Sequence, residues 1–233
     1  MEGIRFILAD AANPYNIGAA ARALANFGFT SLVLVNVFKN DYEKAKKEWL
    51  AEASVSAVDS SFVLERAFFS GTLPEAVSGC DVVFGTSSLH YQVPERQVIS
   101  LPELRAFINE KKYTAPGIVF GCERHGLTKE ELGYCNYIVR IPSHPRQPSI
   151  NLGQAVAITA YELSDMELGA GTYQRKEACP EEIFRFASEI QEALIKKDGP
   201  HWKEKTRLRG IRQALLDAHM DSSAVNALKA LLH

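Results

Sequence analysis

Short apolar runs alternate with helical patterns along most of the first 163 residues. Five runs are rich in β-branched or aromatic residues and contain few polar ones, as strands buried on both faces do. They lie at 4–10, 31–37, 81–87, 117–121 and 137–142. Helical patterns lie between them at 16–29, 43–53, 101–112 and 127–132. This alternation predicts an α/β fold with a parallel sheet covered by helices.

The pattern changes after Leu163. A polar, glycine-containing stretch follows, and the remaining sequence is helical without another strand. We therefore predict a first domain at 1–168, a linker at 169–180 and a small all-α extension at 181–233. The segment 60–69 fits a strand or a helix, and both interpretations stay open.

Composition excludes several classes of protein. The 233 residues contain no long uncharged apolar run, and the N-terminus lacks the pattern of a targeting signal, so we expect a cytoplasmic protein without membrane spans. The four cysteines are widely spaced, with no CxxC pair or histidine cluster beside them, so we expect reduced thiols and no metal site. The formal charge of -2 gives no global sign of a polyanionic partner.

Three segments have residues suited to a functional site. In the first, Asn16 is a good helix N-cap and Gly28 a plausible C′ residue. Arg22 lies between them, either as a solvated surface arginine or as a cation that reaches toward the strand ends.

In the second segment, Gly121 and Gly126 permit close backbone approach on both sides of Glu123, at the carboxyl end of a predicted strand. Thr128 and Glu131 then form a capping box. The segment fits a tight turn or a ligand site.

The third segment has prolines at 142, 145 and 148, which hold the chain extended before an apolar helix. Ser149 and Asn151 stand at the start of this helix, as caps or as groups aimed at a ligand.

Together the three segments resemble the motifs of the SPOUT RNA methyltransferases, in the TrmH (SpoU) branch. The matching positions are Asn16, Gly18 and Arg22, then Gly121, Glu123, Gly126 and Leu127, then Ile141, Pro142, Ser149, Asn151 and Leu152. The resemblance covers about residues 3 to 166. The direct junction to a helical extension is most similar to the TrmJ group, whose members methylate tRNA ribose 2′-oxygens in the anticodon loop.

The resemblance implies a trefoil-knotted α/β domain that acts as a homodimer and binds S-adenosylmethionine in the knot. The apolar helix from Leu152 is the expected dimer contact, although ordinary core packing explains it equally well. The cofactor contacts carried over from the family are Thr86, Ser87, Ser88, Gly121, Ile141, Pro148, Ser149, Ile150 and Leu152.

The same resemblance assigns catalytic roles to Arg22 and to Ser149 of the other protomer. A guanidinium hardly ever loses its proton, so we interpret Arg22 as a cation that holds the phosphate and the developing alkoxide rather than as a base. Asn16, Glu123 and Asn151 complete the predicted catalytic set, and Glu123 and Asn151 are expected to order the knot loops and orient their partners.

RNA binding is predicted for residues 194–213, which contain seven Lys or Arg residues and two acidic ones. The predicted contacts are Lys196, Lys197, Trp202, Lys203, Lys205, Arg207, Arg209 and Arg212. A solvated helix face with Trp202 packed inward is the alternative. The predicted activity is 2′-O-methylation of ribose, with tRNA as the substrate. An rRNA substrate, or a catalytically silent knotted RNA-binding protein, remains open.

Overall fold

The computed structural model describes residues 3–37, 42–88, 96–164 and 177–232. Within these residues, seven parallel strands form one sheet in the order β3-β2-β1-β6-β4-β7-β5. The strands are β1 (Arg5–Ala9), β2 (Leu32–Val35), β3 (Phe68–Ser70), β4 (Val82–Thr86), β5 (Val98–Ser100), β6 (Pro116–Phe120) and β7 (Tyr137–Arg140). The α/β class and the parallel sheet are therefore confirmed.

All five predicted strands are present, β5 was missed, and β3 overlaps the segment 60–69 for which a strand and a helix both stayed open. Both β3 and β5 are three residues long and lie at the edges of the sheet, so they are too short to show a clear period. The segment 60–69, which fitted a strand or a helix, contains one of each: helix α3 (Ser61–Glu65) and then the start of β3.

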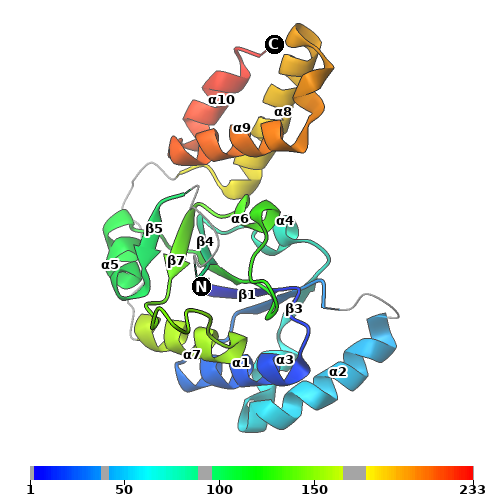
Figure 1. Cartoon of the computed structure of the whole chain (residues 1–233), viewed down its shortest axis with the longest axis vertical. Coiled ribbons are helices and arrows are strands. Elements are labelled where there is room, and N and C mark those ends of the chain that lie inside the picture. Colours follow the sequence, from blue (N-terminus) through cyan, green and yellow to red (C-terminus); the bar gives the residue numbers. More distant parts are fainter. Residues whose placement is uncertain (1–2, 38–41, 89–95, 165–176, 233) are drawn as a thin grey trace.

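Helices cover both faces of the sheet (Figure 1). The core-forming side chains of β1 alternate between two apolar clusters: Phe6 and Leu8 belong to one, and Ile7 and Ala9 to the other. This two-sided burial explains the continuous apolar runs of the sequence. The first cluster includes residues of α1 (Pro14–Asn26), α2 (Tyr42–Ala57), α5 (Leu101–Lys111) and α7 (Leu152–Leu163), and the second includes residues of α4 (Leu73–Ala76) and α6 (Lys129–Leu132).

The start of α1 differs from the prediction. Asn13, not Asn16, is the N-cap, because its side chain accepts a hydrogen bond from the Tyr15 amide and Pro14 occupies the first helical position. The C-terminus follows the prediction: Gly28 has φ +81° and its amide donates to Ala25, while the Phe29 amide donates to Leu24. The helix therefore places Asn16 inside its first turn, where the side chain is free for other contacts.

The C-terminal extension is helical, as predicted. It consists of α8 (Pro180–Asp198), the 3-10 turn η2 (Pro200–Lys203), α9 (Lys205–Asp217) and α10 (Ser222–Lys229). Ile183, Phe186, Leu216 and Val225 form its small apolar core. The predicted linker at 169–180 lies largely outside the described residues.

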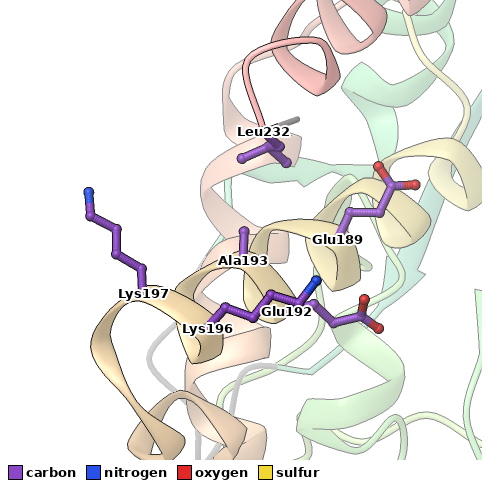
Figure 2. Close-up of a pocket in the computed structure, with 6 residues that line it drawn as sticks. All are labelled: Glu189, Glu192, Ala193, Lys196, Lys197 and Leu232. Atoms are coloured by element: carbon purple, nitrogen blue, oxygen red, sulfur yellow. The ribbon is translucent and has the colours of Figure 1, made fainter.

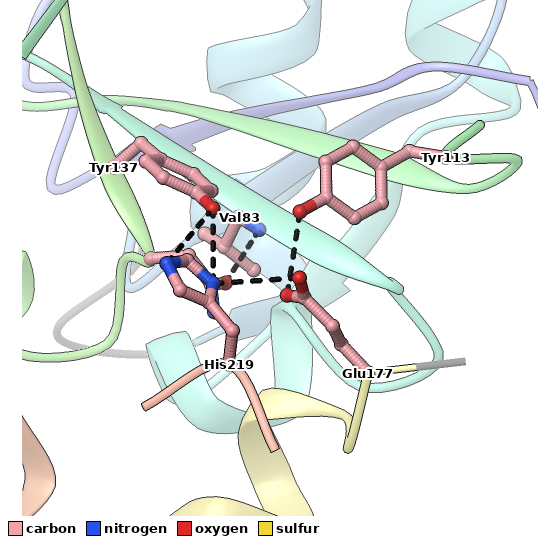
Figure 3. Close-up of polar contacts among 6 residues, drawn as sticks. Val83, Tyr113, Tyr137, Glu177 and His219 are labelled. Atoms are coloured by element: carbon pink, nitrogen blue, oxygen red, sulfur yellow. Dashed lines mark hydrogen bonds and ion pairs between the residues drawn. The ribbon is translucent and has the colours of Figure 1, made fainter. Parts of the chain in front are cut away.

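The extension packs against the amino ends of the strands. His219 stacks on Tyr137, the first residue of β7, with the Tyr137 hydroxyl 3.1 Å from His219 Nδ1 (Figure 3). Glu177 Oε1 lies 3.4 Å from His219 Nδ1, and Glu177 Oε2 accepts a hydrogen bond from the Tyr113 hydroxyl at 3.3 Å. Because the strands are parallel, the extension lies at the opposite end of the sheet from the loops that follow the strands (Figure 1).

None of the described helices is long and apolar enough to cross a membrane. The trefoil knot and the predicted domain limits stay predictions.

Candidate active site

The candidate site is formed by loops that follow four neighbouring strands. In sheet order β1, β6, β4 and β7 lie side by side, so the segments that leave their carboxyl ends meet at one edge. Open α/β sheets bind ligands at this edge. All three predicted motifs reach it, together with the segment after β4.

Glu123 is the anchor of this edge. Its carboxylate accepts hydrogen bonds from the amides of Ala12 (3.1 Å) and Asn13 (3.2 Å) and from Asn16 Nδ2 (2.8 Å). These donors belong to the loop after β1 and the first turn of α1. The carboxylate therefore joins the second motif to the first.

Hydrogen bonding also fixes the charge of Glu123. Partial burial raises its pKa, but hydrogen bonds from Asn16 and from the backbone amides of Glu123, Ala12 and Asn13 outweigh this effect and lower the pKa below its usual value. A carboxylate with a lowered pKa and occupied oxygens is a poor proton acceptor near neutral pH. The geometry suits an organising role for Glu123.

Asn16 and Asn151 extend the network to the third motif. Asn151 Nδ2 donates to Asn16 Oδ1 at 3.0 Å, while Asn151 Oδ1 accepts from the amides of Gly153 and Gln154 and caps α7. Asn151 is therefore both a helix cap and a member of the site.

Glycines permit the close approach of these segments. A Cβ atom at Gly121 would lie 2.1 Å from the carbonyl carbon of Gly126, so the turn around Glu123 requires glycine. A Cβ at Gly153 would lie 3.0 Å from Ala19 Cβ, where α7 packs on α1.

The predicted cofactor residues lie on the segments after β4, β6 and β7. The Thr86 hydroxyl donates to Val119, and the Ser87 amide donates to Val139, so this segment is fixed between the two neighbouring strands. The Ser143 hydroxyl donates to the Pro148 carbonyl at 3.0 Å and folds the proline-rich segment back on itself. Ser88 is exposed, and Ile141 and Ile150 are half-buried.

These segments fit an adenosyl ligand. They offer backbone groups, small hydroxyls and apolar side chains that are not sealed in the core. Leu152 differs, because its side chain is buried in the main core and only its backbone remains for a ligand.

Arg22 and Ser149 stand apart from the Glu123 network. Both are exposed, and Arg22 lies six residues beyond Asn16, which is about 9 Å along the axis of α1. Arg22 shares an exposed stripe with Tyr15, two helical turns away.

Helix α7, which packs on α1 where Gly153 meets Ala19, carries an exposed apolar surface. Tyr15, Ile158 and Tyr161 are 51%, 40% and 65% exposed, and the Tyr161 ring contacts Phe27, the C-cap residue of α1, edge-on. The inner face of α7 packs in the core through Val156 and Ala160. Core packing therefore explains the inner face of this helix, and the dimer contact stays a prediction for its outer face.

The predicted RNA contacts divide into two groups. Lys196, Lys197, Lys203, Lys205 and Arg207 are exposed, and Trp202 and Arg209 are half-buried. The guanidinium carbon of Arg207 lies 5.4 Å from the centre of the Trp202 ring. Arg212 instead lies over the rings of Tyr134 (5.0 Å) and Phe184 (5.4 Å), where α9 and α8 meet the first domain.

A cleft of about 350 Å³ lies on α8 beside Leu232 (Figure 2). Its lining includes Lys196 and Lys197 but also Glu189 and Glu192, so its charge is mixed. It does not form a uniformly basic surface.

Sequence reasoning missed several members of the site. Ala12 and Asn13 act through backbone amides, which leave no side-chain signature, although the Asn13-Pro14 pair is a readable helix start. A close pair formed by Cys122 and His125 was also missed. Among the described residues, no group of three His, Cys, Asp or Glu side chains could hold a metal ion.

The sequence profile of the SpoU rRNA Methylase family matches residues 3–161. This range contains every residue of the Glu123 network. The chain belongs to the SpoU methylase family.

Individual relatives extend the similarity beyond the SpoU domain. The tRNA (cytidine/uridine-2′-O-)-methyltransferase TrmJ of Escherichia coli (strain K12) is 30% identical over 241 residues, which cover 100% of this chain and 94% of the relative. The crystal structure of TrmJ from Z. mobilis ZM4 matches with a TM-score of 0.83 and 28% identity, covering 100% of this chain and 97% of that one. A probable methylase family protein from Haemophilus influenzae Rd KW20 matches with a TM-score of 0.61 and 26% identity, covering 99% and 94%.

Proposed function

We propose that this SpoU-family chain transfers a methyl group from S-adenosylmethionine to a ribose 2′-oxygen in tRNA. The observation that carries the proposal is the similarity along the whole chain, extension included, to an enzyme named as a tRNA (cytidine/uridine-2′-O-)-methyltransferase. The Glu123 network adds to it, because it joins all three family motifs at one edge of the sheet.

The chemistry requires a weak nucleophile to attack a carbon atom. S-adenosylmethionine, when bound, supplies an electrophilic methyl group. The segments after β4, β6 and β7 are proposed to hold it through Thr86–Ser88, Gly121, Ile141 and 148–150. The protein must then orient the ribose hydroxyl and stabilise the negative charge that develops on its oxygen.

Arg22 is the proposed source of that stabilisation. Its side chain is exposed and remains charged, so it is available to the phosphate of the target nucleotide and to the developing alkoxide. Solvent or phosphate then takes the proton. Glu123 is unsuited to this task because its pKa is lowered and its oxygens accept hydrogen bonds from the protein.

A homodimer is part of the proposal. Arg22 shares the exposed face of α1 with Tyr15, next to the exposed Ile158 and Tyr161 of α7. A second copy that covers this apolar surface would bring its own Ser149 segment near Arg22 and enclose the reacting groups. We also place the protein in the cytoplasm, where tRNA is available.

The position of the extension constrains how RNA binds. A strand of four or five residues is about 13–17 Å long, so the extension of one protomer is separated from its own site by about this length of sheet. The exposed lysines of α8, η2 and α9 can therefore contact only RNA that reaches well beyond the target nucleotide, or RNA bound at the site of the other protomer.

An rRNA substrate is the second candidate, because the matching family is described as rRNA methylases. Calorimetry with S-adenosylmethionine, followed by methyl transfer to unmodified tRNA and to rRNA in parallel, separates the candidates. We expect cofactor binding and transfer to tRNA. Transfer to rRNA alone would favour the second candidate, and binding without transfer to either RNA would favour a silent RNA-binding protein.

A further inference from the structure

The turn that carries Glu123 also holds a cysteine and a histidine in contact. The Gly126 amide donates to the Cys122 carbonyl at 2.9 Å and closes the turn, and Gly126 has φ +67°. Cys122 Sγ lies 3.2 Å from His125 Nε2. Because the backbone of the turn is closed, both side chains are held on the same short loop.

The second nitrogen of His125 fixes its tautomer. His125 Nδ1 lies 2.9 Å from the Gly126 carbonyl oxygen, which can only accept a hydrogen bond, so Nδ1 carries the proton. In the neutral ring, Nε2 is then an acceptor. The Cys122 thiol therefore donates to Nε2, in the direction needed for the imidazole to remove its proton.

This arrangement has the three parts of an activated nucleophile: a thiol, a base within hydrogen-bond reach, and a third group that orients the base. Cys122 is buried but keeps 9% of its surface accessible, and its partner His125 is exposed. Cys135, by contrast, is 0% exposed, and burial raises its pKa to about 12 despite the opposing effect of Arg96.

We propose that Cys122 and His125 form a reactive thiol site for hydrogen peroxide, and that oxidation of Cys122 disturbs the turn that holds Glu123. The first part concerns the chemistry of the thiol alone. The second part rests on the proposed methyltransferase function.

Hydrogen peroxide is the oxidant in this step and accepts the electrons that the sulfur loses. The Cys122 S–H proton passes to His125 Nε2 as the sulfur attacks one peroxide oxygen. An S–O bond forms and the O–O bond breaks, so the sulfur loses two electrons and the peroxide gains them. The departing hydroxide takes the proton from the imidazolium, giving a cysteine sulfenic acid and water.

The effect on function follows from the position of the sulfur. An added oxygen on this largely buried sulfur must find space next to His125, so the turn has to shift, whereas the smaller side chain of Cys122→Ala adds no volume there. Glu123 is the next residue along the same closed turn, and its hydrogen bonds depend on the position of that turn. Oxidation is therefore expected to lower methyl transfer.

The chain contains its own controls for the thiol chemistry. Cys179 is more exposed than Cys122, so it would react first if accessibility alone governed oxidation. Cys80 and Cys135 are more deeply buried than Cys122, at 2% and 0% exposed, and should react last.

The test oxidises the full chain with limiting hydrogen peroxide, traps sulfenic acids with dimedone and measures each cysteine by mass spectrometry. We expect Cys122 to be trapped before Cys179. His125→Ala should slow trapping at Cys122 about tenfold or more, and added imidazole should restore it, whereas the exposed His201→Ala should change nothing. Equal or faster trapping at Cys179, or an unchanged rate in His125→Ala, would overturn the proposal.

Methyl transfer to tRNA is then followed during the same oxidation. Wild-type activity should fall in step with Cys122 trapping, while Cys122→Ala should retain activity in peroxide. Equal loss in both proteins would overturn the functional part. A chain that methylates no RNA even before oxidation would instead count against the proposed function, and the trapping rates would still decide the thiol chemistry.

Discussion

The side-chain amide of Asn16 donates to Glu123 Oε1 at 2.8 Å, while its own oxygen accepts from Asn151 Nδ2 at 3.0 Å. Asn16 is thus the central member of a chain of side chains drawn from all three motifs. The arrangement requires one donor and one acceptor at position 16, which an amide provides and a carboxylate does not.

Replacing Asn16 by Asp should therefore destabilise the protein. The substitution removes the donor and places a second negative charge beside Glu123, which we expect to cost about 1–3 kcal/mol in the free energy of unfolding. Urea denaturation measures this change. Asn226→Asp, at an exposed position of α10, is the matched control and should shift stability by less than about 0.5 kcal/mol.

Glu123 should make the stability depend on acid pH. Its folded pKa lies below its unfolded value, so the stabilisation is fully present above the usual carboxyl pKa of about 4.3 and is lost as the pH falls through the folded pKa. Thermal or urea unfolding between about pH 3 and 7 should show a smaller loss of stability in acid for Glu123→Gln than for the wild type. Parallel pH curves for the two proteins would contradict this account.

Arg22 should affect catalysis without affecting the fold. Its side chain is exposed, so Arg22→Ala and Arg22→Lys should change the free energy of unfolding by less than about 0.5 kcal/mol. If the guanidinium binds its partner through two hydrogen bonds at once, Arg22→Lys loses activity at every pH. A pH-rate profile with near-wild-type activity and a shifted limb would instead identify the arginine as a base.

The sequence predicted the longer strands of the sheet better than its two short edge strands. The buried runs of β1, β2, β4, β6 and β7 are long and apolar because helices cover both of their faces. The edge strands β3 and β5 have only three residues each, so periodicity left β3 ambiguous within the segment 60–69 and gave no sign of β5. Strand order was not predicted, since pairing between distant segments leaves no local signal.

In the candidate site, the motif residues were predictable from the sequence, whereas the exact helix start and the contacts between distant segments were not. Motif residues predicted that Asn16, Glu123 and Asn151 act together, and the three are joined by hydrogen bonds. The exact helix start was wrong, because Asn13 competes with Asn16 as a cap and the following proline favours the earlier position. The contact of His219 with Tyr137 was not foreseen, because 82 residues separate the two in sequence.

The extension offers a test of which basic residues bind RNA. Arg212→Ala removes a guanidinium stacked on Tyr134 and Phe184, so it should lower stability by about 1 kcal/mol. Lys205→Ala, at an exposed position, should leave stability unchanged and weaken tRNA binding with a smaller salt dependence. Urea denaturation and salt-dependent binding assays distinguish the two effects. Unchanged affinity in a variant lacking all exposed lysines of this region would remove the extension from the RNA interface.

Mass spectrometry of methylated RNA tests the central claim most directly. Unmodified tRNA is incubated with the full chain and S-adenosylmethionine carrying a labelled methyl group, then digested, and each labelled nucleoside is identified. The account predicts that the label lies on a ribose 2′-oxygen of one nucleotide and that Arg22→Ala abolishes it. Label on a base, or a ribose label that persists undiminished in Arg22→Ala, would contradict the account.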